Sequence, residues 1–238
     1  MRKTILSLCG LVLLAVAQAA FAAKPVLGVA EFNNETSAGW WSGGVGQELS
    51  GMLSNELSNT GDFTVVERAK LDPVLREQDL SAAGALSGES AARVGEITGA
   101  QYLVLGTVSA FESNTSSTGG GISFGGISIG GKKGDAYMAI DLRVVDTTTS
   151  QIVHSRTVEG RASSSGISLG LFKSGFGGRL KNENKTPTGK AIRAALVESV
   201  DYLVCAMVTQ TQRCMDEFDA KEQKRRDSLK DTINLDGP

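Results

Sequence analysis

ISFGGISI, residues 122–129, reads almost the same in both directions and lies at the centre of the stretch 112–141. Two adjacent glycines within alternating apolar and polar residues are typical of a two-residue hairpin turn, which places Phe124 opposite Ile127. Each arm of such a hairpin reaches about 12 residues, whereas a membrane-spanning strand needs roughly 9 to 11. The stretch therefore predicts either a transmembrane β-hairpin or a glycine-rich loop. Four apolar side chains share one face and are the candidate lipid-facing residues: Ile122, Phe124, Ile127 and Ile129.

A second glycine-rich stretch, residues 161–185, shows the same alternation and contains a possible turn at residues 173–175. Backbone groups in lipid must all be paired, and two hairpins per chain cannot close a barrel around a lumen. If the hairpins insert, several chains must therefore share one barrel, and the protein is a homo-oligomer. The lipid-facing candidates of this second hairpin are Ile167, Leu169 and Leu171.

The N-terminus has the order of a cleaved secretory signal. Arg2 and Lys3 precede an apolar run over residues 5–17, and the small residues Ala20 and Ala22 follow it. The run is too short for a stable membrane helix. We expect cleavage after Ala22 and an exported protein. No cysteine directly follows the run, although a lipid-anchored bacterial protein would need one there.

Composition and motifs argue against several function classes. The chain has 26 acidic and 24 basic residues, and this balance does not indicate a nucleic-acid surface. No nucleophile motif, phosphate-binding loop or metal-ligand spacing occurs in the sequence, so we predict no enzyme, no cofactor and no metal site. The single histidine, His154, lies in a predicted strand, and we interpret it as a solvent-facing residue.

Hydrophobic periodicity predicts an α+β fold in which helices pack against a mixed sheet. Apolar or alternating runs predict five strands, at residues 26–32, 63–66, 102–108, 136–145 and 151–160. Helical spacing predicts helices from Val45 to Gly61, from Leu71, over 89–98, from Thr186 onward, and in the charged tail 215–233.

These elements divide the chain into six segments. They are a signal peptide (1–22), the first part of a periplasmic α/β domain (23–111), hairpin one (112–141), periplasmic strands (142–160), hairpin two (161–185) and C-terminal helices (186–238).

Cys205 and Cys214 form a possible disulfide in an exported protein. A continuous helix would separate their Cα atoms by about 13 Å, whereas a disulfide needs roughly 4.4 to 6.8 Å, so a bridge requires a break in the helix. The polar run TQTQ, residues 209–212, is a candidate for that break. Two buried free thiols are the alternative.

Several short motifs, in the right order, resemble the CsgG/HfaB family of curli production assembly and transport proteins. The matching segments span nearly the whole mature chain: VAEFNNET (29–36), FTVVER (63–68), YLVLG (102–106), FESN (111–114) and LRVVD (142–146). The resemblance implies a ring-shaped homo-oligomer whose periplasmic domains form a vestibule and whose hairpins build a shared outer-membrane barrel. Such channels pass unfolded secreted subunits by diffusion, without nucleotide or metal, and work with accessory periplasmic proteins.

The resemblance also implies an aromatic constriction in the segment 34–44, where Trp40 and Trp41 are the candidates. Adjacent tryptophans equally suit a buried anchor. The curli channel is lipidated at an N-terminal cysteine that this sequence lacks, so a second reading remains. In that reading the chain is a soluble, non-catalytic periplasmic helper of the same fold rather than an outer-membrane component.

Overall fold

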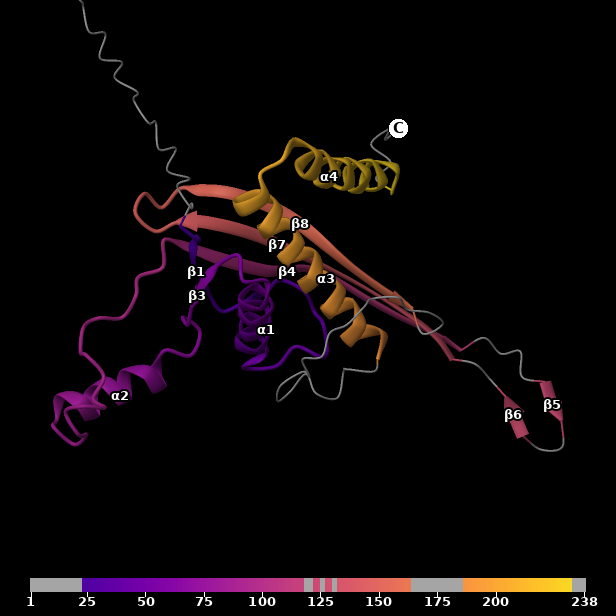
Figure 1. Ribbon diagram of the computed structural model, residues 1–238. Helices are drawn as coiled ribbons and strands as arrows, with labels where there is room; N and C mark the ends of the chain where they lie inside the picture. Colours follow the sequence, from indigo (N-terminus) through magenta and orange to yellow (C-terminus); the bar gives the residue numbers. More distant parts are fainter. Residues whose placement is uncertain (1–22, 118–121, 125–126, 130–131, 164–185, 233–238) are drawn as a thin grey trace, which may run out of the picture.

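The computed structural model describes residues 23–117, 122–124, 127–129, 132–163 and 186–232. A mixed sheet in the order β3-β1-β4-β7-β8 organises it (Figure 1), and β2 pairs with Thr107 and Val108 of β4. The strands at the β1 side are parallel, whereas β4, β7 and β8 form an antiparallel meander. This confirms the predicted α+β class. The strands are β1 (Val26–Val29), β2 (Asn33–Asn34), β3 (Thr64–Val66), β4 (Tyr102–Ser117), β7 (Lys132–Asp146) and β8 (Ile152–Ser163).

In the described residues four α-helices accompany the sheet: α1 (Val45–Thr60), α2 (Asp72–Ala82), α3 (Pro187–Val204) and α4 (Gln212–Thr232). Helix α1 ends where Gly61 adopts a φ of 73°, a left-handed conformation that glycine takes without steric cost. Helix α3 begins at Pro187, and the Thr186 hydroxyl caps it by accepting a hydrogen bond of 3.1 Å from the Gly189 amide. Both ends lie where the sequence predicts them.

The core lies between the sheet and the helices α1 and α3. Alternate β7 residues are fully buried on this face, among them Met138, Ile140 and Leu142. Burying each such side chain contributes about 1.5 to 3 kcal/mol. At Gly160 of β8 the α3 backbone comes so close that a Cβ atom would collide with the carbonyl oxygen of Ala191. This contact sets how closely α3 approaches the sheet.

The hairpin predicted around residues 125–126 has the expected register. Strands β4 and β7 pair as far as Ser117 opposite Lys132, and β5 (Ile122–Phe124) then pairs with β6 (Ile127–Ile129). Phe124 lies opposite Ile127 as predicted. The two short strands lie beyond the far ends of β4 and β7 (Figure 1). The turn glycines and the side chains of residues 114–133 lie outside the described residues.

Two predictions are wrong. Residues 89–98 form turns rather than a helix: Gly95 takes a φ of 81°, and Val94 is 57% exposed, so the segment has no apolar face to bury. His154 does not simply face solvent, because it lies opposite buried Val144 on the sheet face that α3 covers and is itself partly buried. Burial lowers the pKa of its imidazole.

The second glycine-rich stretch lies outside the described residues from position 164 to 185. Its candidate lipid-facing residues, Ile167, Leu169 and Leu171, therefore stay predictions. The first residues of that stretch, up to Ser163, continue strand β8.

Candidate functional site

Trp40 and Trp41 lie in the segment between β2 and α1. Their rings pack edge to face with centroids 5.6 Å apart, and Trp40 packs in the same way on Phe111 of β4, at 5.4 Å. Both indoles are partly buried against the core, and the Trp40 indole N–H has no hydrogen-bond partner among the described residues. The segment predicted to carry a constriction is therefore attached to the strand that continues into the hairpin.

The helix is interrupted between α3 and α4, at the polar run 209–212 that the sequence predicts as the break. Residues Cys205–Thr209 form one π-helical turn, and Gln210 then takes a left-handed conformation with a φ of 48°. The reversal brings the Cα atoms of Cys205 and Cys214 to 5.9 Å, and the two sulfurs form a disulfide. Of the two alternatives that the sequence leaves open, the structure has the bonded one. The bridge fixes the direction in which α4 leaves α3.

Helix α4 is held to the body near its start by an aromatic and cationic cluster. Phe218, 6% exposed, packs edge to face on Tyr202 of α3 with ring centroids 5.4 Å apart. The Arg156 guanidinium lies over the same Tyr202 ring at 5.2 Å and donates hydrogen bonds to the Phe218 carbonyl (3.2 Å) and to Asp219 (2.7 Å). Strand β8, α3 and α4 thus meet at one point.

The far half of α4 is more loosely attached. Lys221 donates to Glu198 of α3 at 2.8 Å, but Leu229 near the C-terminus is 49% exposed. Glu222 accepts hydrogen bonds from Arg225 and Arg226 within the helix, and these bonds lower its pKa to about 2. The Lys221–Glu198 bond therefore ties this part of the helix to α3, whereas the Glu222 bonds lie within the helix.

A polar cluster covers the sheet beside α4. The Tyr137 hydroxyl donates to Glu159 at 2.9 Å, and the Arg161 guanidinium lies 4.9 Å over the Tyr137 ring while it pairs with Glu159. Burial, together with the bond to the Glu159 carboxylate, raises the pKa of Tyr137. One step along the strands, the Thr157 hydroxyl donates to Asp141 at 2.7 Å. The tyrosine thus stays protonated and acts as a donor.

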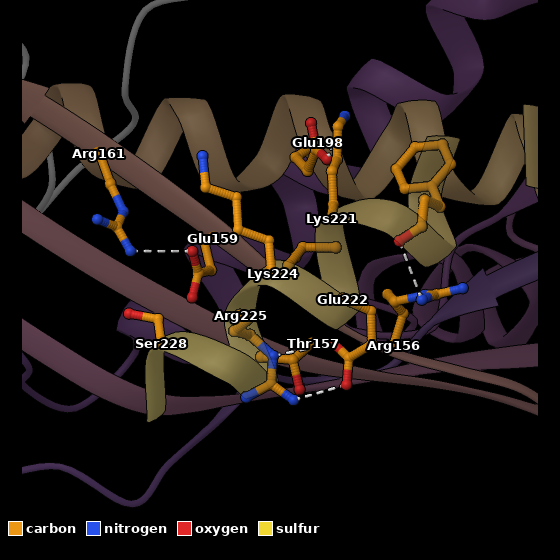
Figure 2. Close-up of a pocket in the computed structure, with 12 residues that line it drawn as sticks. Arg156, Thr157, Glu159, Arg161, Glu198, Lys221, Glu222, Lys224, Arg225 and Ser228 are labelled. Carbon is orange, nitrogen blue, oxygen red and sulfur yellow. Dashed lines mark hydrogen bonds and ion pairs between the residues drawn. The ribbon is translucent and has the colours of Figure 1, made fainter. Parts of the chain in front are cut away.

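A cleft separates α4 from β8 (Figure 2). Its volume is about 450 Å³, and a second cavity of about 670 Å³ shares several of its lining residues, so the two adjoin under the helix. Strand β8 supplies residues 156–159 and Arg161, α3 supplies Glu198, and α4 forms the opposite wall. The α4 residues are Phe218, Lys221, Glu222, Lys224, Arg225 and Ser228.

The arrangement is suited to binding. Within the ranges that the structure describes, no group of three or more His, Cys, Asp or Glu side chains is placed to hold a metal ion. The cleft lining carries charged side chains and one aromatic ring, in a volume typical of ligand sites. The sequence gives no sign of this cleft, because the residues of β8 read as an ordinary alternating strand and those of α4 as a solvated charged helix.

For the lipid-facing candidates of the first hairpin, the structure describes the backbone and not the side chains. Residues 122 and 129, and 124 and 127, are cross-strand partners, so the four positions share one face of the ribbon. In the part of the chain that the structure describes, no helix is both long and apolar enough to cross a bilayer.

Comparison with known proteins finds relatives of similar sequence. It is 28% identical over 186 residues to a predicted lipoprotein of Neisseria meningitidis serogroup B, a match covering 76% of this chain and 75% of that protein. It is also 28% identical over 137 residues to the curli production assembly/transport component CsgG of Escherichia coli K12, covering 56% of this chain and half of the relative.

Among solved structures, a hypothetical protein of Chlamydia trachomatis aligns with 79% of this chain and 99% of its own, at a TM-score of 0.46 and 16% identity. The family model described as the curli production assembly/transport component CsgG matches residues 12–233. Because that match covers nearly the whole sequence, the resemblance predicted from the short motifs is confirmed, and the chain belongs to the CsgG family.

Proposed function

We propose that this chain is a subunit of a ring-shaped outer-membrane channel that passes unfolded secreted protein subunits by diffusion. Its membership of a family of assembly and transport components supports the transport role. The names of its relatives, a predicted lipoprotein and CsgG itself, support an exported protein of the cell envelope. Nucleotide and metal have no part in the proposed mechanism. Accessory periplasmic proteins and the secreted subunits are its proposed partners.

The observation that carries the proposal is the length of the β4–β7 pair. On its other edge β4 pairs with β2, and that pairing ends where Val108 lies opposite Asn34. The pairing of β4 with β7 continues beyond this point as far as Ser117. The ladder of residues 122–129 then continues the hairpin beyond them. The inner part of this ribbon packs on the core through Ala136 and Met138, and its total length matches what a membrane-spanning hairpin needs.

The same hairpin supports an assembly of several chains. Beyond Val108, β4 has β7 as its only strand neighbour in the described residues, so one edge of the ribbon is unpaired. Such an edge is tolerated in lipid only when another chain pairs with it. We therefore propose a homo-oligomeric ring whose hairpins form one closed barrel, with the α/β bodies on the periplasmic side.

Two single aspartate substitutions at neighbouring positions of the hairpin test this function. Ile122→Asp places a carboxylate on the proposed lipid-facing side, whereas Ser123→Asp places it on the other side. We expect Ile122→Asp to remove the protein from alkaline-resistant outer-membrane fractions and to abolish rings seen by electron microscopy, because a charge on the lipid face is costly. Ser123→Asp should retain both properties.

Equal tolerance of the two substitutions would contradict membrane insertion. Recovery of the wild-type protein in the soluble periplasmic fraction, with no rings in detergent extracts, would favour the soluble helper domain instead.

A further inference from the structure

The cleft beside α4 lies along an unpaired sheet edge. Strand β8 is the last strand of the sheet, and β7 is its only strand neighbour in the described residues. Side chains from both faces of β8 line the cleft. Arg156 and Val158 lie on the face that α3 covers, and Thr157 and Glu159 lie on the opposite face. A cavity that contacts side chains on both faces of a strand lies at the edge of that strand. At this edge every second residue directs its amide and carbonyl outward.

Helix α4 forms the second wall of the cleft, across from that edge (Figure 2). The Phe218 and Arg156 contacts hold one end of the helix, and the disulfide fixes the turn that precedes it. Between the walls the space of about 450 Å³ stays open along residues 156–161, a run of about 17 Å of extended strand. This is room for a short extended peptide and not for a helix, whose diameter with side chains is about 10 Å or more.

Charge in the cleft is nearly balanced, with one exception. Arg161 pairs with Glu159, Lys221 with Glu198, Arg225 with Glu222, and Arg156 with Asp219. Lys224 alone among the basic residues of the lining has no ion pair or hydrogen bond in the described residues. In Figure 2 its side chain extends from α4 to the space between Arg161 and Glu198. The cleft therefore offers one unmatched ammonium group.

We propose that β8 and α4 form a groove for an extended peptide segment, which adds to the β8 edge as a strand and pairs an acidic side chain with Lys224. Strand addition supplies affinity through main-chain hydrogen bonds, and the flanking helix supplies side-chain selectivity. The inference does not depend on the channel, because β8, α3 and α4 form the groove whether or not the hairpins insert in a membrane. Failure of one proposal therefore leaves the other intact.

The test uses the full oxidised mature protein and a fluorescent, end-capped octapeptide of alternating Val and Thr with one central Asp. We expect saturable binding by fluorescence anisotropy and about five-fold weaker binding when Asn replaces the Asp, because the charged hydrogen bond to Lys224 is lost. Two further peptides carry N-methyl groups on the odd or on the even amides. A strand added to an edge uses only one of these sets, so only one methylated peptide should lose binding.

Variants locate the site. Lys224→Gln should weaken binding of the Asp peptide about five-fold and leave the Asn peptide unchanged. Lys230→Gln is the matched control, since Lys230 lies on the same helix outside the cleft and is 70% exposed. Hydrogen exchange should show protection of backbone amides within residues 156–161 when the Asp peptide is bound.

Three results would overturn the proposal. The first is no binding, and the second is equal binding of both methylated peptides. The third is protection of the β8 amides by raised protein concentration alone, which would assign the edge to a second copy of this chain.

Discussion

At the level of single residues, Gly160 controls the distance between the sheet and α3. Its Cα position faces the Ala191 carbonyl and the Ala195 amide, so any Cβ atom must displace helix backbone. We expect Gly160→Ala to lower the free energy of unfolding by about 1 to 3 kcal/mol, the usual cost of overpacking. Urea unfolding followed by circular dichroism measures it.

Gly51→Ala is the matched control for that change. Gly51 lies within α1, and a Cβ atom there meets no heavy atom within 4 Å. This substitution should raise stability by about 0.4 to 1 kcal/mol, because alanine restricts the unfolded chain and favours helix. Equal effects of the two alanines would show that the α3 contact does not constrain the sheet.

Glu222 makes stability depend on pH in the acid range. Bonds from Arg225 and Arg226 lower its pKa from 4.5 to about 2, so the folded protein binds the proton less tightly than the unfolded chain does. The stabilisation is fully present above about pH 4.5 and is lost as the pH falls through about 2. The difference in unfolding free energy between wild type and Glu222→Gln should therefore shrink from pH 6 to pH 2. A constant difference would contradict this account.

At the level of the elements, periodicity and turn chemistry predicted the parts whose structure is local. The mirror sequence around residues 125–126 set the hairpin register, and Thr186 with Pro187 marked the start of α3. The helix predicted over 89–98 failed because the segment has helix-forming residues but buries no face. The groove was not predictable, since it depends on where α4 lies relative to the β8 edge, and α4 carries few apolar residues to indicate a contact.

The disulfide determines that placement of α4. It closes a loop of sequence separation 9 around the π-helical turn, and a loop of this size contributes about 2 to 3 kcal/mol in the chain-entropy model. We expect the double variant Cys205→Ser, Cys214→Ser to lose stability of that order and to exchange the α4 amides faster. Reducing agent should reproduce the effect in wild type and have none on the double variant. Unchanged α4 exchange after reduction would show that Phe218 and Arg156 suffice to hold the helix.

At the level of the whole molecule, the tryptophan pair connects the body to the proposed pore. Trp40 rests on Phe111, at the base of the hairpin, so a ring of chains would repeat this aromatic contact around its axis. If the pair forms the constriction, Trp40→Ala with Trp41→Ala should increase single-channel conductance in planar bilayers. Phe111→Leu serves as a control that keeps both indoles. Unchanged conductance in an assembled pore would assign the pair to anchoring alone.

Strand β1 lies between β3 and β4 in the sheet, and this position affects how the chain must fold. Its partner β4 begins at Tyr102, so Leu27 and Tyr102 pair across most of the first hundred residues. Synthesis delivers the N-terminus first, which leaves the apolar strand without one neighbour until β4 has emerged. Contacts of such long sequence separation slow folding. The first strand to be made thus waits for its second neighbour until Tyr102 has emerged, and the nascent chain needs protection from aggregation during that interval.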